Sequence, residues 1–315
     1  MEILLQTVIL VVGFAFLVKG ADWFVEGVSG IAEKFGIPQL VIGLTIVAMG
    51  TSAPEAAVSI TAALKGNAGI TVGNIVGSNI LNILIILGIT GFLVNVAVAK
   101  STLLYEIPYM LLITLVLLTM GMTGQSISFV EGVVLWVLFL MYLFYLYRMA
   151  KDGKNQVENA DGNGAGSRPS WFLLGMAVVG GALIIGGSSL TVDSATYLAR
   201  ILGLSERFIG LTIVALGTSL PELFTSVTAA LKGKADIAIG NIVGSNIFNI
   251  LFVIGTTAFI TPVIFEPKFL IDTMVAVGAG VLLWVSVCRT RTLRRSWGIV
   301  MLVGYAGYLW YLLAM

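Results

Sequence analysis

Long apolar stretches dominate the chain, and short polar connections separate them. A helix needs about 20 mostly apolar residues to cross the hydrocarbon core of a bilayer. Ten stretches of roughly this length can be drawn, so the pattern predicts an all-α integral membrane protein. The expected transmembrane helices lie at 3–29, 38–64, 70–91, 103–121, 127–148, 171–199, 206–231, 237–258, 269–288 and 296–313.

The composition strengthens this interpretation. Of the 315 residues, 58% are hydrophobic and only 10% are charged, and the mean hydropathy is +1.04. A soluble domain of this length has too little core to hide so much apolar surface. The first stretch has no basic residues before it and contains Lys19, Asp22 and Glu26, so we expect it to remain as a helix in the lipid bilayer and not to be cleaved.

Basic residues predict the orientation in the membrane. Ten spans place both termini on one side, where the connections carry four basic residues, namely Lys65, Arg200, Arg207 and Lys268. The opposite side carries twelve, namely Lys34, Lys100, Arg148, Lys151, Lys154, Arg168, Lys232, Lys234, Arg289, Arg291, Arg294 and Arg295. The positive-inside rule therefore places both termini outside and the second set in the cytoplasm. The polar stretch 151–170 is expected to be a flexible cytoplasmic linker.

An internal repeat defines the architecture. Residues 47–84 and 214–251 align without a gap at an offset of 167, with 27 of 38 positions identical. We expect a first five-helix repeat at 1–150, the linker at 151–170, and a second repeat at 171–315. Since each half has an odd number of spans, the second half enters the membrane upside down. Inverted repeats are typical of secondary transporters, which bind their substrates at the repeat interface near the bilayer midplane.

Each repeat contains a polar segment with a proline, GTSAPE ending at Glu55 and GTSLPE ending at Glu222. Proline lacks the N–H that would bond the carbonyl four residues earlier, so Pro54 should break the helix at Gly50, and Pro221 at Gly217. We expect free carbonyls around 48–51 and 215–218. Irregular backbone is tolerated at this depth where it lines a cavity, and free oxygens are the ligands that Na⁺ and Ca²⁺ prefer.

The two glutamates are the least expected residues inside apolar spans. A carboxylate in mid-membrane costs roughly 2.5–3.5 kcal/mol on insertion scales. Two that meet at a repeat interface also repel each other unless a cation lies between them. The alternative is a basic partner, but the only intramembrane candidate, Lys19, has Asp22 and Glu26 nearer along its own helix. The sequence therefore predicts a cation between Glu55 and Glu222.

A second polar stripe follows in each repeat at a spacing of four residues: Asn74, Ser78 and Asn82, and then Asn241, Ser245 and Asn249. Each set shares one face of a helix. Ser and Asn also hold membrane helices together without binding ions. We expect ion contact from Ser78, Asn82, Ser245 and Asn249, and a structural role for the two residues further from the glutamates, Asn74 and Asn241.

These motifs, GTSAPE with GNIVGSNILN and GTSLPE with GNIVGSNIFN, resemble the two alpha-repeats of the calcium/cation antiporter superfamily, and most closely those of prokaryotic sodium/calcium exchangers. The resemblance implies two inverted five-helix repeats with discontinuous second and seventh helices in a prokaryotic cell (inner) membrane. It implies exchange of Na⁺ for Ca²⁺ by alternating access, in which the first and sixth spans slide over the other eight.

The resemblance also implies the residues that hold each ion. Ca²⁺ would be bound by the carboxylates of Glu55 and Glu222 with backbone oxygens at Thr51 and Thr218. Na⁺ would be bound by Ala48, Ser52, Ser78, Asn82, Ala215, Ser219, Ser245 and Asn249.

One position departs from some relatives, because Asn249 stands where potassium-dependent members have an aspartate. Coupling to Na⁺ is therefore favoured over H⁺ or K⁺, which stay as alternatives. A channel would not need paired half-helices. The chain has no histidine and no Ser/Lys pair near the motif, and no ATP-binding signature, which disfavours an enzyme and a primary pump. We expect Ca²⁺ and Na⁺ as transported ions, with no cofactor, nucleic-acid partner or obligate protein partner.

Overall fold

The computed structural model describes residues 2–65, 69–158, 168–203 and 215–314. Within these ranges, eight helices are long and apolar enough to cross a membrane, and the bent pair Gln39–Thr51 and Ala53–Leu64 makes a ninth. The predicted seventh span, 206–231, is described only from Ala215 onward. A tenth crossing there stays a prediction.

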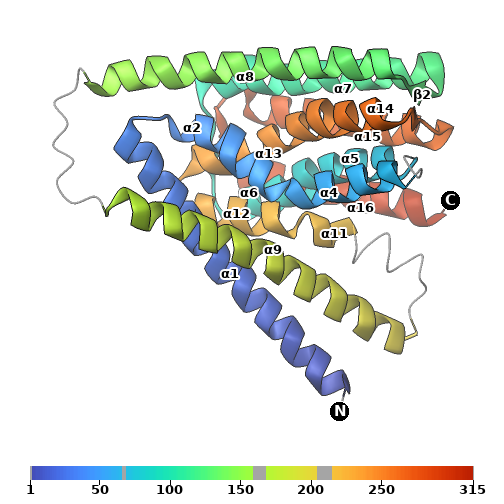
Figure 1. The fold of residues 1–315 in the computed structure, drawn as a ribbon, viewed down its shortest axis with the longest axis horizontal. Coiled ribbons are helices and arrows are strands. Elements are labelled where there is room, and N and C mark those ends of the chain that lie inside the picture. Colours follow the sequence, from blue (N-terminus) through green and yellow to red (C-terminus); the bar gives the residue numbers. More distant parts are fainter. Residues whose placement is uncertain (1, 66–68, 159–167, 204–214, 315) are drawn as a thin grey trace.

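The two halves contain corresponding elements in the same order along the chain (Figure 1). The first half consists of α1 (Glu2–Phe35), α2 (Gln39–Ile42), η1 (Gly43–Val47), α3 (Ala48–Thr51), α4 (Ala53–Leu64), α5 (Gly69–Leu81), η2 (Asn82–Leu87), α6 (Gly88–Leu93), β1 (Val96–Ala97), η3 (Thr102–Glu106), α7 (Ile107–Gly124), β2 (Ser126–Ile127) and α8 (Phe129–Glu158). The second half consists of α9 (Ser170–Ile201), α11 (Ala215–Thr218), α12 (Leu220–Leu231), α13 (Ala235–Phe248), η5 (Asn249–Ile254), α14 (Gly255–Ile260), β3 (Val263–Ile264), α15 (Pro267–Cys288), β4 (Thr292–Leu293) and α16 (Arg295–Ala314).

The sequence repeat is also a repeat of structure. Four pieces of the first half, α3, α4, η2 and α6, have the same lengths as α11, α12, η5 and α14 and begin 167 residues earlier. The elements labelled η are π-helical turns, which are wider than α-helix and frequently occur at functional sites. In both copies such a turn begins at the last asparagine of the polar stripe, Asn82 or Asn249.

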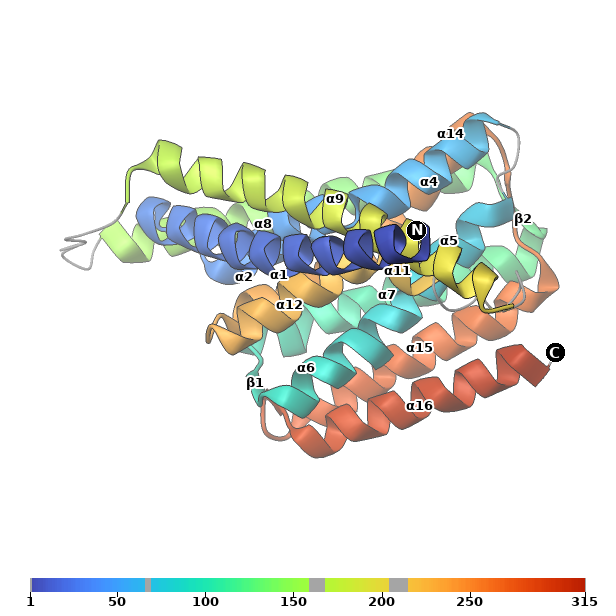
Figure 2. The same cartoon turned by 90° about the horizontal axis from the view of Figure 1, so that it is seen from below.

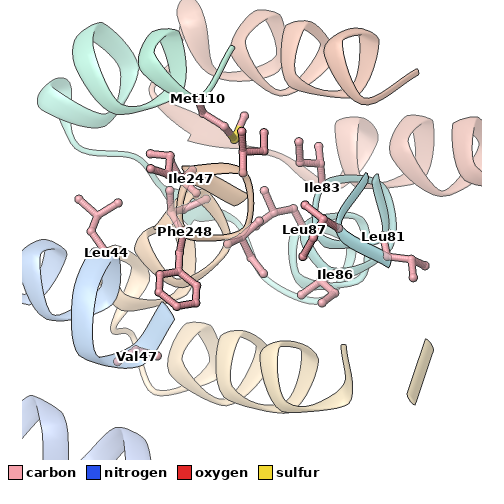
Figure 3. Close-up of a cluster of buried hydrophobic side chains, with 14 of the residues drawn as sticks. Leu44, Val47, Leu81, Ile83, Ile86, Leu87, Met110, Ile247 and Phe248 are labelled. Atoms are coloured by element: carbon pink, nitrogen blue, oxygen red, sulfur yellow. The ribbon is translucent and has the colours of Figure 1, made fainter. Parts of the chain in front are cut away.

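The third and eighth spans form the centre of the bundle. The most apolar windows of Thr71–Leu93 and Ala235–Ile260 are 78% and 94% buried, against 17–39% for the other long helices. Figure 3 shows part of this core, where Ile247 and Phe248 of α13 lie among side chains of η1, η2 and α7. Because lipid is as apolar as this core, close packing and polar contacts hold such helices together.

The helices α1 and α9 pack against each other on one side of the bundle and run obliquely to the others (Figures 1 and 2). Glycines spaced seven residues apart line their antiparallel interface. A Cβ atom added to Gly20 would lie 2.8 Å from the carbonyl oxygen of Gly180, and one added to Gly187 would lie 2.8 Å from that of Gly13. Small residues let membrane helices approach this closely. The pair is therefore packed through backbone, not through interlocked side chains.

Two short antiparallel ladders connect the halves. Val96 and Ala97 of β1 pair with Leu293 and Thr292 of β4. Ser126 and Ile127 of β2 pair with Ile264 and Val263 of β3. The repeat offset carries one ladder onto the other, since β3 follows β1 by 167 residues and β4 follows β2 by 166. Each ladder joins connections that the sequence predicts on the same side of the membrane.

The predicted linker differs from the structure. Residues 151–170 were expected to be irregular, but α8 continues to Glu158 and α9 begins at Ser170. Lys, Gln and Glu have high helix propensity, so the helix that leaves the membrane continues beyond it. The rest of the predicted linker, 159–167, lies outside the described residues.

Candidate cation site

Both proline motifs lie at interruptions of a helix. The axis bends by 48° between Gln39–Thr51 and Ala53–Leu64, and Ser52 has a ψ angle of 6°. Ser219, between α11 and α12, has a ψ angle of 5°. In each copy the proline is the second residue of the new helix, where its missing N–H has no partner to lose. The glutamate follows directly, in the first turn of α4 or α12.

The predicted free carbonyl at Ala48 is not free. It accepts hydrogen bonds from the Ser52 N–H (3.0 Å) and from the hydroxyls of Thr51 and Ser245 (3.3 Å each). The bend begins only at Ser52, so the last turn of α3 stays closed. In the second copy, the Gly217 carbonyl accepts a hydrogen bond from Ser188 (2.7 Å). Ala215 is the first described residue of α11, and its side chain is outside the described part.

The two glutamates are buried, with exposed fractions of 1% for Glu55 and 0% for Glu222. Each accepts a hydrogen bond from the serine of the opposite motif. Ser52 donates to Glu222 Oε1 at 2.7 Å, and Ser219 donates to Glu55 Oε1 at 3.5 Å. The four residues therefore form a crossed arrangement in which each repeat completes the other.

Asn74 and Asn241 hold the backbone behind each glutamate. Asn74 Nδ2 donates to the Glu55 carbonyl (3.2 Å) and to Ser59 (2.9 Å). The second copy repeats this pattern, since Asn241 Nδ2 donates to the Glu222 carbonyl (3.4 Å) and to the Ser226 hydroxyl (2.9 Å). Asn241 also accepts a hydrogen bond from Thr51 at 2.9 Å, which links the two repeats.

Asn79 and Asn246 are contacts that the sequence reasoning missed. Each donates through Nδ2 to the backbone carbonyl of the other at 3.2 Å. Their side-chain oxygens accept hydrogen bonds from the predicted ligands, Asn82 to Asn246 at 2.9 Å and Asn249 to Asn79 at 3.2 Å. The two residues lie off the predicted stripe, so helical spacing did not reveal them. Their identity at the same place in both copies was the available signal.

Four buried oxygens in this region have no hydrogen-bond partner: Glu55 Oε2, Glu222 Oε2, Asn82 Oδ1 and Asn249 Oδ1. They form two pairs, each related by the repeat offset. Neither glutamate forms an ion pair with a described basic residue, and the described residues contain no cluster of three His, Cys, Asp or Glu. Unsatisfied buried oxygens of this kind are costly unless a ligand completes them.

Ser78 and Ser245 lie on opposite sides of this network. Ser245 donates to the Ala48 carbonyl, and the Ser78 hydroxyl is among the groups that act on the Glu55 carboxyl. Both serines are buried, with exposed fractions of 4% and 0%. Thr51 is buried as well, and Thr218 ends α11 at the second interruption. The structure thus places every described candidate residue at the two interruptions or on the central helices.

The acidic residues of α1 do not line this site. Asp22 forms ion pairs with Lys19 (3.2 Å) and with Lys232 (2.6 Å). The Lys19 contact follows the expectation from spacing along the helix, and the Lys232 contact was not predicted. Glu26 lies 2.7 Å from Arg168 and 3.7 Å from Lys232. These charges hold α1 to the connection after α12.

Comparison with known proteins places the chain among transporters. The family model described as sodium/calcium exchanger protein matches residues 5–148 and 172–314. The putative antiporter CaxA of Alkalimonas amylolytica is 39% identical over 312 residues, which cover 97% of this chain and 98% of that protein. The sodium/calcium exchanger MaX1 of Methanosarcina acetivorans is 33% identical over 341 residues, with 96% of each chain covered.

A solved structure of the sodium-calcium exchanger NCX_Mj has the same fold. It superposes with a TM-score of 0.84 at 32% sequence identity and covers 98% of this chain and 99% of its own. None of these names describes an enzyme.

Proposed function

Because the chain belongs to the sodium/calcium exchanger family, we propose that it exchanges Na⁺ for Ca²⁺ across the membrane and holds Ca²⁺ between Glu55 and Glu222. The observation that carries this proposal is the pair of unpartnered carboxylate oxygens, one from each repeat, buried without a described basic neighbour. A divalent cation would balance both charges at once. Ca²⁺ takes six to eight oxygen ligands, so backbone oxygens at Thr51 and Thr218 would complete its shell.

The Na⁺ ions are assigned to the hydroxyl and amide oxygens around the carboxylates. Asn82 Oδ1 and Asn249 Oδ1 lack partners, and a cation would satisfy each of them. Ser52 and Ser219 already contact the carboxylates, and Ser78 and Ser245 lie on the central helices beside them. The carbonyl of Ala48, and by the repeat that of Ala215, would complete these sites. Binding of Na⁺ and Ca²⁺ to shared oxygens makes the two ions compete, which an exchanger requires.

The interface of α1 and α9 supports alternating access. Backbone packed on backbone through glycines lets the pair shift as one body, because no side chains interlock across the other helices' surface. We assign the motion to α1 and α9 and the fixed scaffold to the other spans. In this assignment the two five-helix repeats are inverted, the second and seventh helices are discontinuous, both termini face outward from a prokaryotic cell membrane, and the linker is cytoplasmic.

Vesicles that contain the purified protein test the proposal directly. Vesicles loaded with Na⁺ and diluted into choline should take up ⁴⁵Ca²⁺, and uptake should collapse when the Na⁺ gradient is dissipated. Uptake that is equal with Na⁺, choline or a pH gradient inside would refute coupling to Na⁺. The same assay with H⁺ and K⁺ gradients separates the two alternative couplings. A variant of an exposed acid, Glu266→Gln, is a control for loss of charge alone.

A further inference from the structure

A third buried carboxylate lies outside the Glu55–Glu222 pair. Glu106 ends the π-helical turn η3, one turn inside the end of the bundle where β1 pairs with β4. Its exposed fraction is 1%. The Tyr145 hydroxyl donates to its Oε1 atom, while Oε2 has no partner. The proposed exchange mechanism does not use this residue.

A second unpartnered oxygen belongs to the same turn. Thr102 has an exposed fraction of 0%, and its hydroxyl makes no hydrogen bond, although threonines elsewhere in these helices donate to the carbonyl four residues earlier, as Thr114 does to Met110. Thr102 and Glu106 begin and end η3, and the Thr102 hydroxyl acts on the Glu106 carboxyl. One wide turn thus presents a hydroxyl and a carboxylate oxygen, both buried and both unsatisfied.

No described basic residue balances this charge, since none forms an ion pair with Glu106. The ionisable groups that face it are Asp236 from α13 and Tyr142 and Tyr145 from α8. Tyr109, on the next turn of α7, stacks on Tyr142 at a centroid distance of 5.7 Å. The nearest charged group is therefore another acid. A buried carboxylate in such surroundings needs a cation or a proton.

The second half shows that the fold does not require this cluster. The offset of 167 carries Glu106 onto Thr273 and Thr102 onto Phe269. Thr273 is buried and donates to the Phe269 carbonyl at 2.6 Å, so nothing there is unsatisfied. Asp236 and Tyr145 correspond to Gly69 and Leu312. The helix α15 is also regular where η3 is π-helical. The polar cluster is thus a feature of one half only.

The π-helical turn itself points to a ligand. The other such turns in the described residues are η1, η2 and η5, which border the proposed Na⁺ and Ca²⁺ sites. Widened turns free backbone oxygens and recur at functional positions. Of these four described turns, only η3 lies away from that region, and it carries the acid.

We propose that Glu106 and Thr102, with the Tyr145 hydroxyl, form a further binding site for one monovalent metal cation, Na⁺ or K⁺, separate from the site between Glu55 and Glu222. One carboxylate and neutral oxygens suit a single positive charge. The site also has a route to the exchange machinery, because the Tyr142 hydroxyl beside Glu106 donates to the Leu44 carbonyl of η1 at 3.4 Å, one turn before Ala48.

Thermal unfolding of the purified protein in NaCl, KCl and choline chloride at equal ionic strength tests this site. The wild type should melt about 3 °C higher in Na⁺ or K⁺ than in choline when the cation is tenfold above its dissociation constant. Glu106→Gln should lose this increment, and so should Glu106→Thr, which introduces the residue that the second half has at Thr273. Thr102→Val should weaken the apparent cation affinity several-fold. Thr114→Val removes a hydroxyl that is already satisfied and should leave the salt-dependent increment intact.

The same measurements in a Glu55→Gln/Glu222→Gln background separate this site from the proposed exchange site. The increment that depends on Glu106 should persist there, even though Ca²⁺ exchange is lost. Melting temperatures that ignore Glu106 in all three salts would overturn the proposal. A Glu106-dependent melting temperature that follows pH but neither Na⁺ nor K⁺ would assign a proton and would also overturn a metal-cation site. If Glu106→Gln does not fold, Glu106→Thr carries the comparison.

Discussion

The two halves of the molecule agree at the ion-binding centre and differ where α1 and α9 meet the rest of the bundle. At the centre, contacts occur in pairs related by the repeat, such as Ser52 with Glu222 and Ser219 with Glu55. At the periphery the pairs are broken. The residues kept in both copies are those that would touch an ion, and the residues that differ are those that hold the α1–α9 pair in place.

The charges along α1 illustrate the difference. Asp22, Glu26 and Glu33 of α1 all pair with bases, the last with Lys234 at 2.5 Å. The repeat offset carries these acids onto Ser189, Asp193 and Arg200 of α9, and it carries Lys232 back onto Lys65. Asp193 and Lys65 form no ion pair with each other in the described part of the chain. One end of the pair is therefore closed by charge and the other is not.

Packing differs in the same sense. Ser188 of α9 donates to the Gly217 carbonyl, and Val192 leaves no room for a side chain at Gly217. The corresponding residue of α1 is Ala21, which has no hydroxyl to offer Gly50. A Cβ atom at Gly50 would meet only Phe24, at 3.9 Å. In this state α9 rests on its own helix interruption and α1 stands away from its counterpart. An inverted repeat in one conformation must be asymmetric in this manner, since symmetry would leave both sides equally open or closed.

The largest effect should come from the shared centre. Glu55→Gln and Glu222→Gln should each reduce Na⁺-driven ⁴⁵Ca²⁺ uptake at least about 100-fold, because each removes half of the charge that balances Ca²⁺. The two losses should be equal within a few-fold if both repeats contribute alike. A variant that retained a substantial share of wild-type uptake would break the symmetry of the centre and remove that glutamate from the site.

The asparagine bridge should come next and should again be symmetric. Asn79→Ala and Asn246→Ala each leave buried amide and carbonyl groups without partners, which costs about 1–3 kcal/mol of stability. Thermal unfolding in detergent should show similar drops for the two variants. Asn74→Ala, which removes hydrogen bonds within one repeat only, is the matched control for a bridge between repeats. Very different drops for Asn79 and Asn246 would show that one side of the bridge is dispensable.

The charged end of α1 should give a smaller and asymmetric effect. Exposed ion pairs contribute about 0–1 kcal/mol, so Lys232→Ala should shift the balance between the two access states about fivefold at most. A cysteine introduced near Asp22, in a chain where Cys288 is replaced by serine, should become more reactive toward a membrane-impermeant thiol reagent. Lys65→Ala should leave its labelling unchanged. Equal effects of the two lysines would refute the difference between the ends.

The smallest change should follow exchange of the residues that face the glycines. Ser188→Ala removes one hydrogen bond to Gly217, which is typically worth about 1 kcal/mol, and should alter the rate of exchange a few-fold without changing the apparent affinity for Ca²⁺. Ala21→Ser offers Gly50 the bond that it lacks. If both substitutions slow exchange to the same extent, hydrogen bonding at the interruptions does not distinguish the two states.

Much of this architecture could be predicted from the chain, for reasons that particular residues make clear. Pro54 and Pro221 break their helices by their own covalent structure, and an exact repeat of 167 residues relates Glu55 to Glu222. The ion pair between Asp22 and Lys232 depends on the packing of residues 210 positions apart, which no local pattern encodes. Glu106 lies near the end of a span, where an acid is ordinary, so only its burial in the structure sets it apart. The free carbonyl expected at Ala48 was wrong because the bend comes one turn later.

The two strand ladders have a consequence for how the chain unfolds. Each ladder joins a connection of one half to a connection of the other, at opposite ends of the bundle. A half that came apart would thus leave backbone groups of the other half unpaired. Although the duplicated pattern suggests two modules, melting should proceed as a single cooperative transition, and neither half should hold its structure when it is produced alone.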